Sequence, residues 1–146
     1  MSEVEEKLDD PVIQWVTFWL GDECYGVNVM QVQEVLRITE IAPVPGAPDY
    51  VIGIINLRGN VVTIIDMRSR FGLKPKQADD DSRIIILESD DQVIGMLVDG
   101  VREVVDLRAS AIDSTPHVGN GESSKYIQGV RSKNKELLIL LDLNKL

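Results

Sequence analysis

Two aspartates are the residues of this sequence whose placement could support catalysis, because they occupy equivalent places in two similar stretches. Asp66 ends "NVVTIID" and Asp142 ends "ELLILLD". Two carboxyl groups related by an internal repeat can share a proton and act as acid and base, as in a pseudo-symmetric hydrolase. Each aspartate is followed by Met67 or Leu143, however, without the small residue and glycine of such a catalytic loop. The simpler interpretation is that each carboxylate caps a following helical turn.

The other candidates for chemistry are isolated in the sequence. The single histidine, His117, stands in "STPHVGNG", and no second histidine, cysteine or acid cluster has metal-ligand spacing. "GNGESSK" fits neither a phosphate-binding loop nor the dinucleotide fingerprint. Asp22 and Glu23 lie beside the only cysteine, Cys24, at a predicted hairpin tip and should raise its thiol pKa. We therefore expect no catalytic residue, no metal and no cofactor.

Arg58 is a cation between two apolar runs in "VIGIINLRGNVVTIID". The runs predict a β-hairpin, and Gly59 and Asn60 tolerate the positive φ that a tight turn demands. The turn then has no need of Arg58. A guanidinium on a long apolar stem suits a carboxylate or carbonyl of a partner, so Arg58 is the best candidate of this hairpin for partner contact.

Short strands with tight turns must position these residues. Apolar runs predict strands at residues 13–20, 25–29, 51–57, 61–66, 83–88, 93–98, 101–107, 126–131 and 137–142. The segment Met30–Arg37 has apolar residues at helical spacing, which predicts a short helix or a bent strand. A second helical turn is predicted at Met67–Phe71.

The first strand raises a question about its two tryptophans. Val16, Phe18 and Leu20 share one face of an alternating strand, and Trp15 and Trp19 share the other. Only one face of the strand can point into a small barrel, and the face with Phe18 and its aliphatic neighbours is the better candidate for the core. Trp15 and Trp19 would then lie under the N-terminal arm, against the other lobe, or on a partner surface.

The chain also contains an internal repeat. "WVTFWLGDECYGVNVMQVQEVLRI" matches "IIILESDDQVIGMLVDGVREVVDL" 69 residues later, and "YVIGIINLRGNVVTIIDM" matches "YIQGVRSKNKELLILLDL" 76 residues later. The predicted fold class is all-β, with two small five-stranded barrel lobes that share an interface. We expect a flexible acidic arm at residues 1–12, a first lobe at roughly 14–70 and a second at roughly 83–146, with possible exchange of elements.

Composition excludes several classes of function. The net charge of −9 repels phosphate backbones and anionic lipid, which disfavours a small β-barrel that binds nucleic acid. No apolar run approaches 18 residues, and the acidic N-terminus does not look like a signal peptide. We therefore expect a cytoplasmic protein without membrane insertion.

Three stretches carry a resemblance to a known family. "GDECYGVNVMQVQEVLR", "YVIGIINLRGNVVTIIDMRSRFGL" and "VIGMLVDGVREVV" resemble the bacterial chemotaxis coupling proteins, the CheW-like family. The resemblance runs from about residue 13 to 146, and "G-x-x-N-L-R-G" followed by an apolar strand and "D-x-R" is its most specific part. The sequence departs from the family at Thr63, where many relatives have proline, and at Met67, where leucine is usual.

The resemblance implies a non-catalytic adaptor built from two intertwined five-stranded β-barrels of the SH3-like type. Such proteins link transmembrane chemoreceptors to a cytoplasmic histidine kinase, and they dock on the signalling tip of the receptor and on the regulatory domain of the kinase. The protein would be recruited to receptor arrays at the membrane.

The resemblance also implies where the partners bind. The receptor tip would lie in an apolar groove bordered by Met30–Arg37, a familiar way to bind a helix. The receptor-contact residues expected from it are Arg58, Val32, Val35, Glu34, Val101 and Val104, with Leu36 in the core. The alternative is that the valines are ordinary core residues and Glu34 a solvated charge. The kinase would dock on the surface of the first lobe, whose contact residues we do not name.

Overall fold

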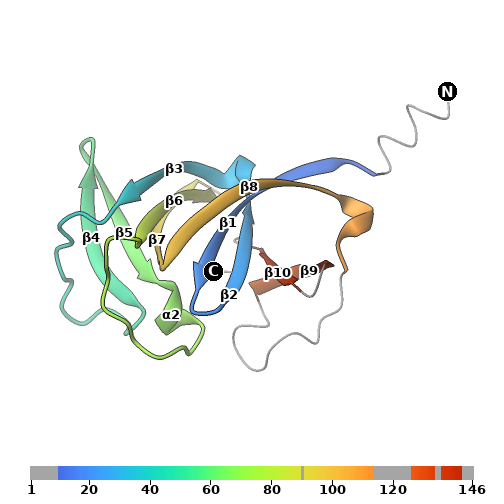
Figure 1. Cartoon of the computed structure of the whole chain (residues 1–146). Helices are drawn as coiled ribbons and strands as arrows, with labels where there is room; N and C mark the ends of the chain where they lie inside the picture. Colours follow the sequence, from blue (N-terminus) through green and yellow to red (C-terminus); the bar gives the residue numbers. More distant parts are fainter. Residues whose placement is uncertain (1–9, 90, 114–125, 134–135, 143–146) are drawn as a thin grey trace.

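The computed structural model describes residues 10–89, 91–113, 126–133 and 136–142 (Figure 1). Ten strands dominate, and the helical elements whose bounds are described are three short turns. In chain order the elements are β1 (Val12–Leu20), β2 (Glu23–Asn28), η1 (Val29–Gln31), β3 (Val32–Arg37), β4 (Val51–Leu57), β5 (Asn60–Asp66), α2 (Met67–Arg70), β6 (Arg83–Ser89), β7 (Gln92–Val98), β8 (Gly100–Arg108), η2 (Ala109–Ala111), β9 (Ile127–Lys133) and β10 (Glu136–Leu141).

The strands form two five-stranded sheets, each of which takes strands from both halves of the chain. The β1 sheet has the order β8-β1-β2-β10-β9, and the β6 sheet has the order β3-β6-β7-β5-β4. Figure 1 shows the two sheets side by side, with β3 to β7 on the left and β1, β2 and β8 to β10 on the right. Below, the β1 lobe and the β6 lobe are the barrel-like units built on these sheets. The predicted all-β architecture of two intertwined lobes is confirmed.

The internal repeat extends to the register of the strand pairs. Leu140 lies beside Gly26 where β10 runs parallel to β2, and Ile64 lies beside Gly95 where β5 runs parallel to β7. These two pairs are repeat equivalents. In both, the glycine makes room for the aliphatic side chain, because a Cβ on Gly26 would lie 3.0 Å from Leu140 and one on Gly95 only 2.4 Å from Ile64.

The main hydrophobic core lies between the two sheets. Phe18 and Val27 of the β1 sheet pack there with Ile85 and Met96 of the β6 sheet. A second cluster fills the interior of the β6 lobe and consists of Ile55, Val62, Ile64, Ile84 and Ile86. The Phe18 face of β1 is therefore core, as predicted, although it faces the other lobe.

The tryptophans of β1 occupy the opposite face, and the position of Trp15 excludes two of its three predicted locations, while the N-terminal arm at residues 1–9 lies outside the described residues. The Trp15 side chain is completely buried. A Cβ added at Gly26 would lie 3.6 Å from the Trp15 Cβ and close to Leu138 and Leu140, so Trp15 packs with residues of its own lobe. Trp15 thus lies neither against the other lobe nor on a partner surface. Exchange of strands puts β1 between the inter-sheet core and the interior of its own lobe, so both faces bury side chains. Trp19, at the end of the strand, keeps 36% of its surface exposed.

The predicted helix or bent strand at Met30–Arg37 is a short 3-10 turn followed by a bent strand. Val32 lies opposite Leu87 and Glu34 lies opposite Ile86, so Gln33 is an extra residue that forms a β-bulge. The helical turn predicted at Met67–Phe71 is confirmed as α2.

Polar contacts hold the segment that precedes β1. Asp10 accepts hydrogen bonds from the Ser110 amide and hydroxyl, and β1 begins two residues later. Residues 1–9, His117 and the rest of the 114–125 stretch lie outside the described residues. None of the described helices is long and apolar enough to span a membrane.

Candidate functional site

The β4–β5 hairpin presents Arg58 in a strained conformation. Leu57 pairs with Asn60, so Arg58 and Gly59 are the two turn residues, with φ of 51° and 88°. The prediction that Gly59 and Asn60 supply the positive φ was wrong, because Asn60 already belongs to β5. Asn56 supports the turn by accepting a hydrogen bond from the Gly59 amide at 2.9 Å. A two-residue turn needs positive φ at both positions, and Arg58 adopts it at a cost that glycine would avoid.

Arg58 forms an ion pair with Glu34 across the β6 lobe. Both guanidinium Nη atoms donate to the carboxylate, and the Nη1–Oε1 distance is 3.2 Å. The hydrogen bonds from Arg58 hold the pKa of Glu34 below its usual range. Arg58 remains 67% exposed and Glu34 28% exposed, so the planar guanidinium is oriented but still accessible to a partner.

The valines of β3 lie next to this ion pair in the sequence. Val35 is opposite Ile85 and Val32 is opposite Leu87, and both partners belong to the inter-sheet core. The two valines therefore share a face, while Glu34 points to the other side of the strand with its partner Ile86. Val32 is partly buried against the core and Val35 is 41% exposed.

The repeat-equivalent strand β8 places Val101 and Val104 in the same way. They lie opposite Phe18 and Val16, and a bulge at Arg102 corresponds to the one at Gln33. Val101 is partly buried against the core, whereas Val104 is 53% exposed. β3 and β8 are edge strands of different sheets, so the structure joins Arg58 directly to Glu34 alone among the six predicted residues.

The two candidate catalytic aspartates terminate corresponding strands of different sheets. Asp66 is the N-cap of α2, and its carboxylate accepts the Arg68 amide hydrogen bond at 3.0 Å. Burial raises the pKa of Asp66, and Arg68, Ser69 and Asp99 are the groups that act on it. Asp142 follows β10, and its backbone amide donates to the Tyr126 carbonyl. The capping interpretation is confirmed for Asp66.

Cys24 lies within β2, at a position that sequence reasoning placed at a hairpin tip. The side chain is buried, and burial raises the pKa of the thiol against the influence of Arg102, whose Nη1 lies 3.9 Å from the sulfur. The predicted direction of the shift is right, but burial is its main cause. Among the described residues, no group of three histidine, cysteine or acidic residues could hold a metal ion.

A second ion pair was missed by sequence reasoning. Arg68 of α2 donates to both carboxylate oxygens of Asp99, which also accepts the Gly21 amide hydrogen bond at 2.6 Å. Both side chains are largely buried, at 16% and 14% exposed. The pair connects α2 to the β7–β8 connection and the β1–β2 turn. "D-x-R" after β5 was noted as a motif, but nothing local pointed to Asp99, 31 residues away.

Comparison with known proteins identifies the family to which the chain belongs. The sequence model of the CheW-like domain matches residues 14–146. The chain belongs to the CheW-like domain family. It is 34% identical over 147 residues to "Chemotaxis protein CheW" of Treponema pallidum (strain Nichols), with 98% of this chain and 86% of that protein covered. It is 33% identical over 133 residues to the protein of the same name from Klebsiella aerogenes, with 91% and 80% covered.

A solved CheW structure has the same architecture. The match is to the crystal structure of "scaffolding protein TtCheW" from Thermoanaerobacter tengcongensis, with a TM-score of 0.83 and 33% sequence identity. The alignment covers 89% of this chain and 88% of that one. The chain therefore shares its double-lobed fold with that protein over the aligned residues.

Proposed function

We propose that the chain is a non-catalytic adaptor that couples transmembrane chemoreceptors to a cytoplasmic chemotaxis histidine kinase. The family match over residues 14–146 carries this proposal, since the relatives are named as chemotaxis and scaffolding proteins. The capping role of Asp66 also favours an adaptor over the hydrolase alternative. Working from the cytoplasm, the protein would join receptor arrays at the membrane.

The receptor-contact surface in this proposal is the β3 edge of the β6 lobe with the β4–β5 hairpin. Arg58 is its central residue, because Glu34 fixes the guanidinium while leaving 67% of the side chain exposed. Val32 and Val35 supply the adjacent apolar face, and Val101 and Val104 supply the repeat-equivalent face on β8. Exposed, oriented arginines are enriched among interface anchors. The kinase regulatory domain would dock on another surface, in the first half of the chain.

Replacing Arg58 by alanine tests the proposal. Arg58→Ala should weaken binding of a receptor signalling-tip fragment about tenfold, as expected for an interface anchor. Binding of the kinase regulatory domain should not change. Isothermal titration with each partner, together with circular dichroism, would measure both effects. Lys76→Ala is the matched control, since it removes an exposed, ion-paired cation from a loop outside this surface. Unchanged receptor affinity in a normally folded Arg58→Ala protein would contradict the proposal.

A further inference from the structure

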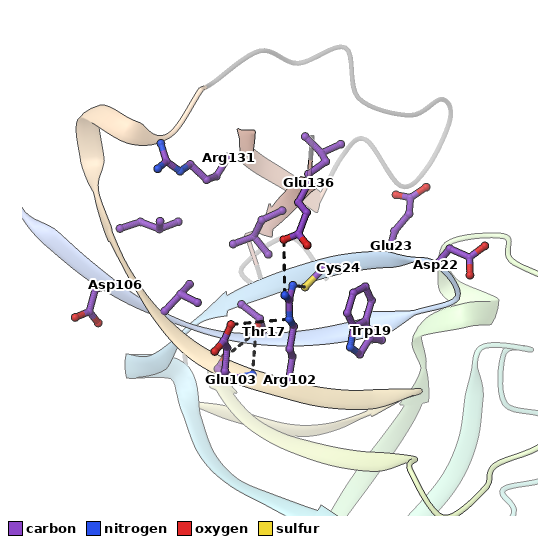
Figure 2. A pocket seen from close by; sticks show the side chains of 14 residues that line it. Thr17, Trp19, Asp22, Glu23, Cys24, Arg102, Glu103, Asp106, Arg131 and Glu136 are labelled. Carbon is purple, nitrogen blue, oxygen red and sulfur yellow. Dashed lines mark hydrogen bonds and ion pairs between the residues drawn. The ribbon is translucent and has the colours of Figure 1, made fainter. Parts of the chain in front are cut away.

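The β1 lobe contains a hollow of about 680 Å³ that the receptor-contact surface does not include. Figure 2 shows Arg102 reaching from β8 toward Cys24 and Glu136 at its centre, with Trp19 beside Cys24. Val105, Leu107, Leu137 and Leu138 supply its apolar lining. A hollow of this size is typical of sites that take a small ligand or a few residues of a peptide.

The internal repeat provides a control for this hollow. Positions that line the interior of the β6 lobe hold Ile55 and Ile86, which are both buried in its aliphatic cluster. The equivalent positions of the β1 lobe hold Arg131 and Thr17, and both line the hollow. The strand registers of the two lobes match, so the backbone is not the reason for the difference. One lobe is filled by isoleucine, whereas the other has polar groups around an open space.

The charges of the lining are predominantly negative. Five acidic and two basic residues line the hollow, namely Asp22, Glu23, Glu103, Asp106, Glu136, Arg102 and Arg131. Arg102 is held within the protein: its guanidinium lies 5.2 Å from the Trp19 ring centroid and 3.7 Å from a Glu136 oxygen. An anionic occupant would face the excess of carboxylates, whereas a lysine or arginine would be attracted to them.

We propose that this hollow, the β1-lobe pocket, binds a short peptide segment of another protein in which a basic residue lies beside large apolar side chains. The apolar side chains would contact Leu137, Leu138 and Val105, and the basic group would lie near Glu136 and Glu23. Leu137 and Trp19 are 42% and 36% exposed, so apolar surface is available to such a segment. The acidic lining and the protein's net charge of −9 favour this occupant over a nucleic acid or an anionic metabolite.

The full-length chain can report binding by itself. It has two tryptophans, of which Trp15 is completely buried and Trp19 lines the pocket. We would titrate the protein with a nonapeptide of alternating leucine and lysine and follow tryptophan fluorescence and heat. We expect saturable one-to-one binding, with a fluorescence change that Trp19→Phe abolishes. A leucine–glutamate peptide of the same length should bind at least tenfold more weakly.

Two pairs of matched variants distinguish the pocket from general attraction to an acidic protein. Glu136→Lys should weaken binding of the leucine–lysine peptide at least tenfold, whereas Glu40→Lys, an equal charge change on an exposed loop of the other lobe, should change it less than twofold. Leu137→Ser should weaken it about threefold, whereas Val61→Ser, at a residue 68% exposed in the other lobe, should not.

Equal losses in Glu136→Lys and Glu40→Lys would overturn the proposal, as would equal affinity for the two peptides. Receptor-tip binding should be intact in Glu136→Lys, because Glu136 lies on β10, whereas the proposed receptor-contact residues lie on β3, on β8 and in the β4–β5 hairpin. Failure of this proposal would therefore leave the adaptor proposal untouched.

Discussion

At the scale of single residues, Arg58 combines its proposed binding role with backbone strain. Its positive φ is one that non-glycine residues adopt at a cost, yet the turn tolerates it. We expect Arg58→Gly to raise the midpoint of thermal unfolding by about 2–4 °C relative to Arg58→Ala, because glycine relieves the strain. Both variants should lose the same affinity for the receptor tip. Differential scanning calorimetry would measure the first effect, and equal midpoints would show that the turn is not strained.

Thr17 is a buried polar residue that holds the bulge of β8. Its hydroxyl donates to the Glu103 carbonyl at 2.6 Å and accepts from the Glu103 amide at 3.1 Å. Thr17→Val keeps the shape of the side chain but leaves both backbone groups without this partner, so we expect a loss of about 1–3 kcal/mol in the free energy of unfolding. Urea unfolding would measure it. Thr63→Val, at a partly buried threonine of β5, is the control and should cost much less.

The sequence allowed Arg58 to be selected as a partner residue but misplaced its turn. Gly59 and Asn60 have the stronger preference for positive φ, so propensity favoured them over an arginine. Strand pairing decides otherwise, because Leu57 and Asn60 pair and leave Arg58 in the turn. Glu34 could not be linked to Arg58 from the sequence, since no spacing rule connects residues that are 24 positions apart in a β-rich chain.

At the scale of elements, the bulge of β3 explains why its sequence resembles a helix. In a regular strand, Val32 and Val35 would lie on opposite faces. The extra residue Gln33 shifts the alternation, so the two valines share a face three residues apart, as they would in a helix. The same pattern recurs at Val101 and Val104 of β8. A repeated three-residue spacing within a β-rich sequence therefore indicated a bulge as well as a helix.

Gly53 and Gly129 are repeat-equivalent glycines where another segment crosses a strand. A Cβ at Gly53 would lie 2.1 Å from the carbonyl oxygen of Ala42, whose backbone is fixed by two hydrogen bonds to Ile54. A Cβ at Gly129 would lie 2.6 Å from Cγ2 of Ile112 and 3.0 Å from the carbonyl oxygen of Asp113, so its backbone contact is less severe than the one at Gly53.

The two alanine variants should therefore differ in stability. We expect Gly53→Ala to lower the free energy of unfolding by about 3 kcal/mol, and Gly129→Ala by about 1–2 kcal/mol, because the added Cβ would overlap the hydrogen-bonded carbonyl of the crossing segment far more severely at Gly53 than at Gly129. Chemical denaturation of both variants would test this. Equal losses would mean that the crossing segments are equally adaptable.

At the scale of the whole molecule, the repeat predicted the double-lobed fold but not the difference between the lobes. Matching glycines and strand patterns indicated two similar units, and the registers of the two sheets bear this out. The open β1-lobe pocket arises from substitutions such as Arg131 for Ile55. Their effect depends on which side of each strand faces the interior of the lobe. The sequence could not predict that side, because strands are exchanged between the lobes.

The Arg68–Asp99 pair has no counterpart in the repeat as the structure describes it, and it connects the two lobes. Arg68 follows β5 of the β6 sheet, whereas the Gly21 amide that also contacts Asp99 belongs to the β1–β2 turn of the other sheet. Burial acts to raise the pKa of Asp99, but the hydrogen bonds from Arg68 and Gly21 outweigh it and leave the pKa below its usual value.

The pair should therefore make stability depend on pH in the acid range. Above about pH 4, Asp99 is ionised in both folded and unfolded chains, and only the folded chain pairs it. As the pH falls through the ordinary carboxyl pKa of 3.8 and then the lower folded pKa, the unfolded chain gains its proton first and is favoured. Asp99→Asn should cost about 1–2 kcal/mol at neutral pH, with part of the interaction screened by solvent.

The decisive measurement is the difference in the free energy of unfolding between wild type and Asp99→Asn from pH 7 to pH 2. It should shrink toward zero below pH 4, because the lost interaction is already absent in acid. Arg68→Leu should show the same pH profile, and the double variant should add little to either single change, since both remove one interaction. A difference that stays constant with pH would mean that Asp99 stabilises the junction of the lobes through packing alone and not through its charge.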